Sequence, residues 1–297
     1  MAGLRRSLHF VPGANEKMLD KSLALAADAL VLDLEDAVTP DRKDDARAVI
    51  RSWLDDVDFG GKEVVVRANP LDTPWGRADV EALLAGRPPD ALLVPKTRGP
   101  GDLQVFHELL LACERSGGHP EGGVELIVIA TETPEGVLAL PHLARAQRVT
   151  GLTWGAEDLS AAIGARRNRD DAGRYLPVFE YCRITTLLSA AAAGVTPIDG
   201  VWVDFRDLDG LAAECREGAD AGFVGKMTIH PGQVDVVNEI FSPSAQEIAD
   251  ATELLEAFAE NERAGRMAFA FRGEMVDVPH LERARRILAR AEAIARA

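Results

Sequence analysis

The chain has 297 residues, of which 47% are hydrophobic and 27% are charged, and its formal net charge at pH 7 is -15. This is the composition of a globular protein with a sizeable core, and the acidic balance excludes a general binder of nucleic acid or membrane surfaces, because those partners are anionic too. With no signal-peptide pattern and no apolar run near ~20 residues, we expect a cytoplasmic protein that has no membrane segment and acts on a small molecule.

Eight short apolar runs follow one another along the chain, with segments of helical period between them. They lie at residues 7–13, 29–36, 63–70, 91–96, 125–132, 151–158, 200–207 and 222–230. The runs are almost continuously apolar, as expected of parallel strands buried on both faces. Strand followed by helix, eight times over, predicts an α/β fold of the (β/α)8 TIM barrel type, which typically takes ~250 residues.

The pattern changes near residue 243. Two long helical segments, 244–264 and 279–297, flank a hairpin-like stretch that reads "GRMAFAFRGEMVDVPH". We therefore predict two parts, a barrel over residues 1–242 and a C-terminal helical and hairpin extension over residues 243–297. From the residues alone, this extension would be a structural cap.

Nearly every predicted strand ends in polar residues. These are Asp33, Glu35, Asp36, Arg67, Asn69, Lys96, Glu132, Glu157, Asp158, Asp204, Arg206, Asp207 and His230. Solvated loop charges would account for any one of them. In TIM barrels, however, the chemistry gathers at the carboxyl ends of the strands, and carboxylates that converge there repel one another unless a cation neutralises them.

Glu132 and Asp158 form the best candidate pair, because they end the fifth and sixth predicted strands, which are neighbours in a barrel. Carboxylates suit a hard cation, and Mg²⁺ often takes one or two of them while substrate and water fill its other positions. Glu157 is either only the neighbour of the candidate ligand Asp158 or an acceptor of hydrogen bonds that support the metal site. The three cysteines and six histidines show no paired spacing, so neither a disulfide framework nor a zinc site is predicted.

Arg67 and Lys96 bring positive charge to this acidic end. An arginine offers a fixed two-point grip on a carboxylate or enolate oxygen. Lys96 allows a competing hypothesis, the nucleophile of a Schiff-base aldolase. That role is less favoured, because Lys96 is followed by a Gly/Pro loop and no apolar pocket is evident that would lower its pKa.

Eight motifs together resemble one known family. In chain order they are "RSLHFVPG", "ADALVLDLEDAVTPDRKDDAR", "VVRANPLDTPWG", "LLVPKT", "ETPEG", "GLTWGAEDLSAAIGA", "GKMTIHPGQVDVVNEIFSPS" and "RGEMVDVPHLERARRIL". In these motifs the chain is similar to the citrate lyase β-subunit-like family of CoA-ester lyases. The resemblance implies a barrel that binds Mg²⁺, assembles as a trimer or hexamer, and cleaves or forms a carbon–carbon bond beside a CoA or acyl-carrier thioester.

The resemblance also implies roles for single residues. Glu132 and Asp158 would be the Mg²⁺ ligands, and Arg67 would hold and polarise the substrate. Glu35 and Asp36 would hold metal-bound water or orient Arg67, although ion pairs with residues 41–47 are an alternative for Asp36.

Further roles concern the cofactor and the neighbouring subunit. Arg6, Lys96, Lys226 and His230 would lie near the thioester and its nucleotide tail. Asp277, in the extension, would reach the site of a neighbouring subunit, as an aspartate does in related malyl-CoA and citramalyl-CoA lyases.

Two positions depart from the family pattern. Pro134 and Glu135 stand where many relatives have an arginine, and Ala162 stands where many have a second aspartate. The basic stretch with Arg166, Arg167 and Arg169 would then be either a replacement anion site or a solvated loop.

The resulting functional hypothesis is a Mg²⁺-dependent carbon–carbon lyase for a 3-hydroxyacyl-CoA thioester such as malyl-CoA or citramalyl-CoA. One alternative is a class II metal-dependent aldolase acting on free 2-keto acids. Another is a non-catalytic subunit that binds acyl-CoA or an acyl carrier within a lyase complex. A homotrimer or hexamer is expected.

Overall fold

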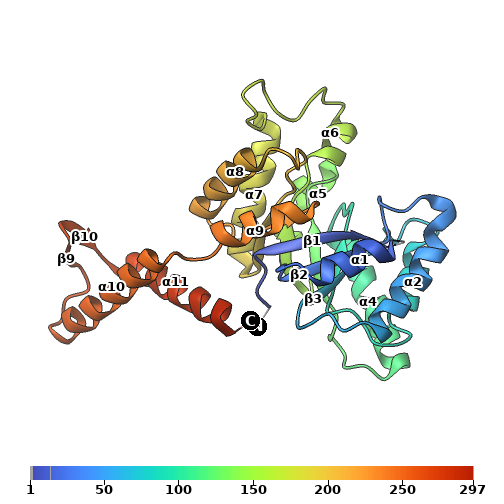
Figure 1. Cartoon of the computed structure of the whole chain (residues 1–297). Coiled ribbons are helices and arrows are strands. Elements are labelled where there is room, and N and C mark those ends of the chain that lie inside the picture. Colours follow the sequence, from blue (N-terminus) through green and yellow to red (C-terminus); the bar gives the residue numbers. More distant parts are fainter. Residues whose placement is uncertain (1–2, 14, 297) are drawn as a thin grey trace. The chain divides into compact units, whose positions relative to one another are not determined.

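Eight parallel strands close into a barrel, in which each strand pairs with the next and β8 pairs with β1. The computed structural model, drawn in Figure 1, describes residues 3–13 and 15–296. The strands are β1 Ser7–Pro12, β2 Ala29–Asp33, β3 Glu63–Arg67, β4 Ala91–Val94, β5 Glu125–Ile129, β6 Val149–Thr153, β7 Thr196–Asp199 and β8 Gly225–Thr228. The predicted (β/α)8 fold is therefore confirmed.

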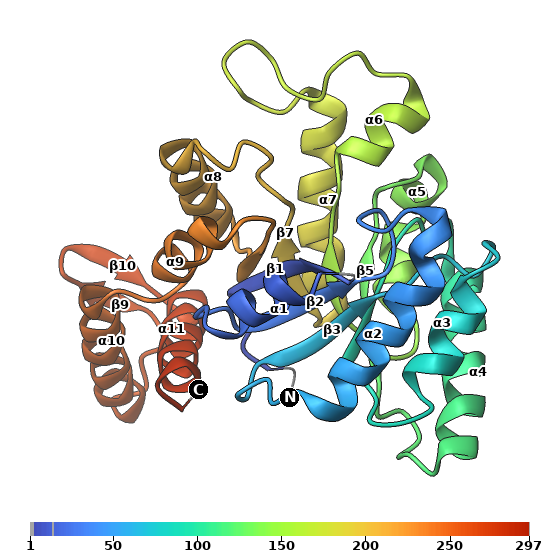
Figure 2. The same ribbon diagram turned by 45° about the vertical axis from the view of Figure 1, so that its right-hand side comes forward.

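Helices follow the strands and cover the outside of the barrel, as α2, α3 and α4 do beside β1 to β3 in Figure 2. They are α1 Glu16–Leu23, α2 Lys43–Asp56 (preceded by the 3-10 turn η1 Pro40–Arg42), α3 Gly76–Leu83, α4 Pro100–Gly117, α5 Pro134–Leu143, α6 Glu157–Ile163, α7 Pro177–Ala193, α8 Leu208–Ala221 and α9 Pro231–Ile240. The start of α5 is determined locally: the Thr133 hydroxyl accepts the amide of Gly136 at 3.0 Å, and Pro134 opens the helix. Among the described residues, no helix is long and apolar enough to cross a membrane.

Alternate residues of each strand serve two different cores. Leu8, Val31, Val65, Leu93, Ile127 and Ile198 fill the barrel interior. Their neighbours, such as Leu30, Val66 and Val128, pack outward beneath the helices. Both faces are buried, which explains why the strands read as continuous apolar runs.

The seventh strand differs from its prediction. β7 is Thr196–Asp199, and residues 200–207 form a series of turns. Pro197 is tolerated because β7 pairs with β6 through only two residue pairs, so few N–H groups are needed. Asp199 rather than Asp204 therefore ends the strand, and it is fully buried.

A buried arginine closes the amino end of the barrel. The Arg5 guanidinium donates to both oxygens of Glu63 at 2.8 and 2.6 Å, to Glu125 at 2.9 Å and to the Thr150 hydroxyl at 3.1 Å. These partners lie on β3, β5 and β6, so one side chain ties three strand starts together. Arg5 is 2% exposed.

Contacts between residues divide the chain into two compact units, residues 1–238 and 239–297. The second unit consists of α10 Ala245–Arg263, the antiparallel strands β9 Phe269–Phe271 and β10 Glu274–Val276, and α11 Val278–Arg296. Phe258, Val276 and Leu281 form its own small apolar core. The expected helix, hairpin and final helix are confirmed.

Candidate active site

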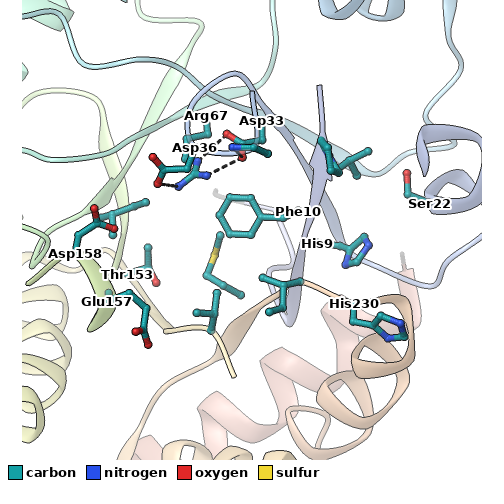
Figure 3. Close-up of a pocket in the computed structure, with 18 of the residues that line it drawn as sticks. His9, Phe10, Ser22, Asp33, Asp36, Arg67, Thr153, Glu157, Asp158 and His230 are labelled. Atoms are coloured by element: carbon teal, nitrogen blue, oxygen red, sulfur yellow. Dashed lines mark hydrogen bonds and ion pairs between the residues drawn. The ribbon is translucent and has the colours of Figure 1, made fainter. Parts of the chain in front are cut away.

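Asp33 and Arg67 stand side by side at the carboxyl ends of β2 and β3. Arg67 donates from Nε to Asp33 Oδ1 at 2.8 Å and from Nη2 to Asp33 Oδ2 at 2.6 Å (Figure 3). Its Nη1 lies 3.0 Å from Glu35 Oε2. Burial lowers the pKa of Arg67, but the adjoining carboxylates outweigh burial and raise it. The arginine is thus a fixed cation at the mouth of the barrel.

The turn that carries these acids is held from below by Lys43. Its ammonium donates to the carbonyls of Leu34 and Glu35 at 2.8 and 2.7 Å and to Asn69 Oδ1 at 2.8 Å. Lys43 belongs to the segment 41–47, but it contacts the backbone of the turn. Asp36 lies 3.5 Å from Arg67 and 3.1 Å from Lys96. Of the roles considered for Asp36, these contacts favour the orientation of Arg67 over an ion pair with residues 41–47.

Lys96 links the acidic turn to the next strands. Its backbone has φ of 53°, in the left-handed region that non-glycine residues rarely adopt, and its amide donates to Glu132 Oε2 at 2.6 Å. Its ammonium bonds Glu35 and lies 3.1 Å from Asp36 and 3.5 Å from Asp158. Burial alone would lower the pKa of Lys96, but these carboxylates raise it, which is the opposite of what a Schiff-base nucleophile requires.

Glu132 and Asp158 both line the same cavity. Glu132 is 5% exposed, and burial raises the pKa of its carboxyl to about 8, with the charge of Asp158 adding to the effect. A carboxylate in this position is stabilised only if a cation accompanies it. Among the described residues no three acidic, His or Cys side chains form a metal cluster. Glu132 and Asp158 nevertheless offer carboxylate oxygens, the ligands that Mg²⁺ prefers.

The cavity has a volume of about 660 Å³ and extends to both sides of β1. Inside the barrel mouth it is lined by Phe10, Asp33, Arg67, Glu132, Thr153 and Asp158. Beyond β1 it is lined by His9, Met18, Lys21, Ser22 and His230. Figure 3 shows Phe10 and His9 on opposite sides of the strand, as the alternation of strand residues requires.

The outer part of the cavity contains two histidines. His9 Nδ1 lies 3.0 Å from the Thr228 hydroxyl, and burial together with the charge of His230 lowers its pKa to about 4. The ring of His230 stacks on Phe205 with centroids 4.9 Å apart, and its Nδ1 accepts the amide of Gly232 at 3.1 Å. His9 is therefore a neutral wall residue, and His230 lies at the start of α9.

Comparison with known proteins settles the family. Residues 6–231 match the family model described as HpcH/HpaI aldolase/citrate lyase. The chain belongs to this family. The predicted relationship to the citrate lyase β-subunit-like CoA-ester lyases is thereby confirmed, and the protein is a lyase-family enzyme.

The relatives of this HpcH/HpaI protein align over nearly its whole length. A (3S)-malyl-CoA thioesterase of Cereibacter sphaeroides is 40% identical over 294 residues, which are 98% of this chain and 95% of that protein. The mitochondrial citramalyl-CoA lyase of Mus musculus is 37% identical over 98% of this chain and 87% of its own. The protein CitE from Mycobacterium tuberculosis, crystallised with magnesium, acetoacetate and coenzyme A, is 35% identical with a TM-score of 0.80, over 97% of this chain and 98% of that one.

Two residues expected near the thioester lie elsewhere in this HpcH/HpaI barrel. Arg6 precedes β1 at the amino end and pairs with Asp28 at 2.8 Å, on the opposite side of the barrel from the cavity. Lys226 is fully buried, with its ammonium 3.0 Å from Asp199 and 2.8 Å from Glu214. An ammonium without access to solvent and paired with two carboxylates cannot meet a substrate, so the expected role is corrected for both residues.

The departures from the family pattern do not line the cavity. Glu135 and Ala162 are exposed, on α5 and α6. Within the basic stretch, Arg167 pairs with Asp171, and Arg169 pairs with Glu214 at 2.6 Å. Two of the three arginines considered for a replacement anion site are therefore already paired with carboxylates of this chain.

The remaining expected residue, Asp277, lies in the second unit, immediately before α11. Its Oδ1 is 2.7 Å from Nδ1 of His280, so an imidazole accompanies the carboxylate. Its approach to a neighbouring subunit's site stays a prediction.

Three functional candidates were not selected from the sequence. Asp33 was noted as a strand-end acid, but only the register of β2 and β3 identifies it as the main partner of Arg67. Lys21 and Met18 lie on the outer face of α1, and helical periodicity alone gives no sign that a cavity reaches them.

Proposed function

We propose that this protein is a Mg²⁺-dependent carbon–carbon lyase that cleaves, or forms, a 3-hydroxyacyl-CoA thioester such as malyl-CoA or citramalyl-CoA. The observation that carries the proposal is the meeting of Glu132, Asp158 and Arg67 in one cavity at the carboxyl end of the barrel. The magnesium and coenzyme A held by the related CitE structure support the same assignment. Glu132 and Asp158 are the proposed metal ligands.

In this proposal Arg67 binds the substrate. Asp33 and Glu35 occupy its guanidinium from one side, so its position is set before any ligand arrives. When bound, Mg²⁺ would supply polarisation of the hydroxyl and carbonyl oxygens of the substrate. Arg67 would stabilise the negative charge that develops on oxygen as the carbon–carbon bond breaks.

Lys96 supports the carboxylates in three ways: its amide fixes Glu132, and its ammonium bonds Glu35 and lies against Asp158. As the carbon–carbon bond breaks, the substrate hydroxyl loses its proton and becomes a carbonyl. The electron pair of the broken bond passes to the thioester fragment as an enolate, which must take up one proton to leave as the acyl-CoA. Asp277 of a neighbouring subunit is the proposed proton donor.

The nucleotide tail of the thioester is proposed to leave the barrel mouth over β1. The outer part of the cavity there offers the Lys21 cation, the apolar Met18 and the flat ring of His230. Lys96 lies beside the inner part, close to where the thioester itself would be. These residues replace Arg6 and Lys226 in the proposed binding set.

A second candidate function is thioester hydrolysis, because a malyl-CoA thioesterase is 40% identical over 98% of this chain. The two reactions leave different products. Cleavage of malyl-CoA by a lyase gives acetyl-CoA and glyoxylate, whereas hydrolysis gives malate and free CoA.

One screen tests both functions and the earlier alternatives. The purified protein is incubated with Mg²⁺ and a panel of hydroxyacyl-CoAs, and the products are identified by mass spectrometry. Acyl-CoA plus a 2-oxo acid supports the lyase. Turnover of free pyruvate-derived aldols but of no thioester would indicate the aldolase, and tight binding of thioesters without turnover would indicate a non-catalytic subunit.

A further inference from the structure

A short hairpin, residues 168–176, follows α6 and borders the β6 side of the cavity. The backbone amide of Leu176 donates to the carbonyl of Asn168 at 2.8 Å, and the backbone amide of Asp170 donates to the carbonyl of Arg174 at 2.8 Å, so the two arms pair as in a β-ribbon. This is the basic stretch that the sequence left open between an anion site and a solvated loop. Its arginines are not equivalent.

Arg169 is held by contacts on three sides. Its guanidinium lies 3.6 Å from the ring centroid of Tyr175 and 4.6 Å from that of Trp202, and its Nη2 donates to Glu214 at 2.6 Å. The guanidinium is thus stabilised by contact with two aromatic rings and by an ion pair with a buried carboxylate. Arg169 therefore fixes the hairpin to the β7–α8 turn and to α8.

The hairpin in turn contacts the rim of β6 at two points. The ring of Tyr175 contacts Trp154 edge to face, with centroids 4.8 Å apart. The side-chain Nδ2 of Asn168 donates to Glu157 Oε1 at 2.8 Å. Trp154 and Glu157 both line the cavity. They flank the turn that leads into Asp158.

Trp154 is also fixed by a hydrogen bond from its Nε1 to Asp199 Oδ1 at 2.7 Å. Lys226 bridges Asp199 Oδ2 and Glu214 Oε1, and Arg169 binds the other oxygen of Glu214. A continuous chain of buried charges thus runs from Arg169 to the cavity wall. This gives the buried Lys226 a structural place.

We propose that Arg169 is a positioning residue, which holds the hairpin 168–176 against the β6 rim so that Trp154 and the turn carrying Glu157 and Asp158 keep the placement needed to bind metal and substrate. This inference rests on the proposed function for its metal and substrate, but the restraint on residues 154–158 stands on the contacts alone. Mutation of a group that orients metal ligands in this way typically lowers metal affinity or activity by roughly 10–100-fold.

The test compares Arg169→Met and Arg169→Lys with wild type in the full-length protein. Arg169→Lys keeps a cation beside Glu214, so the buried carboxylate is not left unpaired and the variant should fold. It lacks the flat guanidinium that stacks on Tyr175. Arg167→Met is the matched control, because Arg167 is exposed in the same stretch and pairs only locally with Asp171. Asn168→Ala removes the second contact without touching the buried charges.

The first measurement is hydrogen exchange of the amides in residues 154–158, without metal or substrate. We expect exchange roughly tenfold faster in Arg169→Met, a smaller increase in Arg169→Lys and in Asn168→Ala, and no change in Arg167→Met. Wild-type exchange in both Arg169 variants would overturn the inference.

The second measurement is Mg²⁺ affinity by calorimetry. We expect roughly tenfold weaker binding in Arg169→Met and wild-type affinity in Arg167→Met. If the wild-type protein binds no Mg²⁺, the proposed function fails, while the exchange experiment still decides the role of Arg169. Faster exchange with unchanged Mg²⁺ affinity would show that the hairpin only stabilises the fold, and the positioning role would be overturned.

Discussion

Asp33 and Arg67 lie directly opposite one another where β2 and β3 end, and two hydrogen bonds of 2.8 and 2.6 Å join their side chains. This pair orders the guanidinium in advance, because these two hydrogen bonds go to one carboxylate with fork-like geometry. A cation prepared in this way stabilises developing charge without reorganising at the moment of reaction.

Arg67→Lys tests this geometry, because lysine keeps the charge but cannot reproduce the two-point pair. We expect the turnover rate to fall roughly 100-fold with the fold intact. Steady-state kinetics on the thioester found by the screen and a circular dichroism melt measure the two properties. Arg77→Lys, on the exposed face of α3, is the control, and near-normal turnover in Arg67→Lys would remove Arg67 from the mechanism.

Metal dependence can be tested both by activity and by stability. We expect EDTA to abolish turnover and Mg²⁺ to restore it, and we expect Mg²⁺ at 100 times its Kd to stabilise the wild-type fold by about 2.7 kcal/mol. Glu132→Gln should lose this stabilisation in a thermal-shift experiment. Glu135→Gln, three residues along and exposed, should keep it; stabilisation of Glu132→Gln equal to wild type would contradict the assigned ligand.

Lys96 should not form a Schiff base. The carboxylates around its ammonium raise its pKa although burial lowers it, so the neutral amine that attacks a carbonyl is scarce at neutral pH. We expect sodium borohydride added during turnover to leave both the activity and the intact mass unchanged. A mass increase on the peptide that contains Lys96 would revive the Schiff-base mechanism.

The proposed role of Asp277 in a neighbouring subunit can be tested by mixing two inactive proteins. In the proposal, each site combines Glu132 of one subunit with Asp277 of its neighbour. In a mixed oligomer, a site made by the barrel of an Asp277→Asn subunit and the extension of a Glu132→Gln subunit has both residues intact. We expect activity to return on mixing after subunit exchange. Mixing Glu132→Gln with Arg67→Lys, both in the barrel, is the control; recovery there, or none with Asp277→Asn, would argue against a shared site.

His9 should make the stability of the protein depend on pH. Burial and the charge of His230 lower the pKa of His9 to about 4, whereas an unfolded histidine titrates near ~6.5. The unfolded chain therefore takes up a proton first as the pH falls, so stability should decrease between about pH 6.5 and about pH 4, by up to about 1.4 kcal/mol per unit.

Urea unfolding across that range measures the effect. His9→Gln should show a shallower decline than wild type, because glutamine takes up no proton. His142→Gln, exposed on α5, should retain the wild-type slope. If wild type and His9→Gln lose stability equally with falling pH, His9 has the same pKa in the folded and the unfolded chain, and the prediction is wrong.

The sequence predicted the barrel because each strand is buried on both faces and therefore lacks polar interruptions. It misplaced the seventh strand, since "VWV" at 201–203 reads as a strand whereas the true strand contains Pro197. The same error affected the candidate site, because Asp204 was taken as a strand-end acid. The acid that ends β7 is Asp199, which forms ion pairs with Lys226 and Arg183.

Arg6 and Lys226 show the limit of reading charges near strand ends. A lysine inside a strand points inward or outward according to its phase, and Lys226 is out of phase with Met227, which faces the barrel interior. Arg6 lies at the start of β1, and only the closed barrel shows that this start faces away from the cavity. The pairing of Arg67 with Asp33 likewise depends on the register between two strands.

The Arg5 cluster at the base of the barrel has a consequence for kinetics. Arg5 and the aliphatic side chains of the interior fill the barrel below the cavity, so we expect substrate and products to pass through the mouth of the barrel. In the proposed lyase, a small fragment formed at the bottom of the cavity would then leave only after the thioester fragment above it has left. The small fragment, released last, should therefore inhibit competitively with substrate, whereas the thioester fragment, released first, should give mixed inhibition.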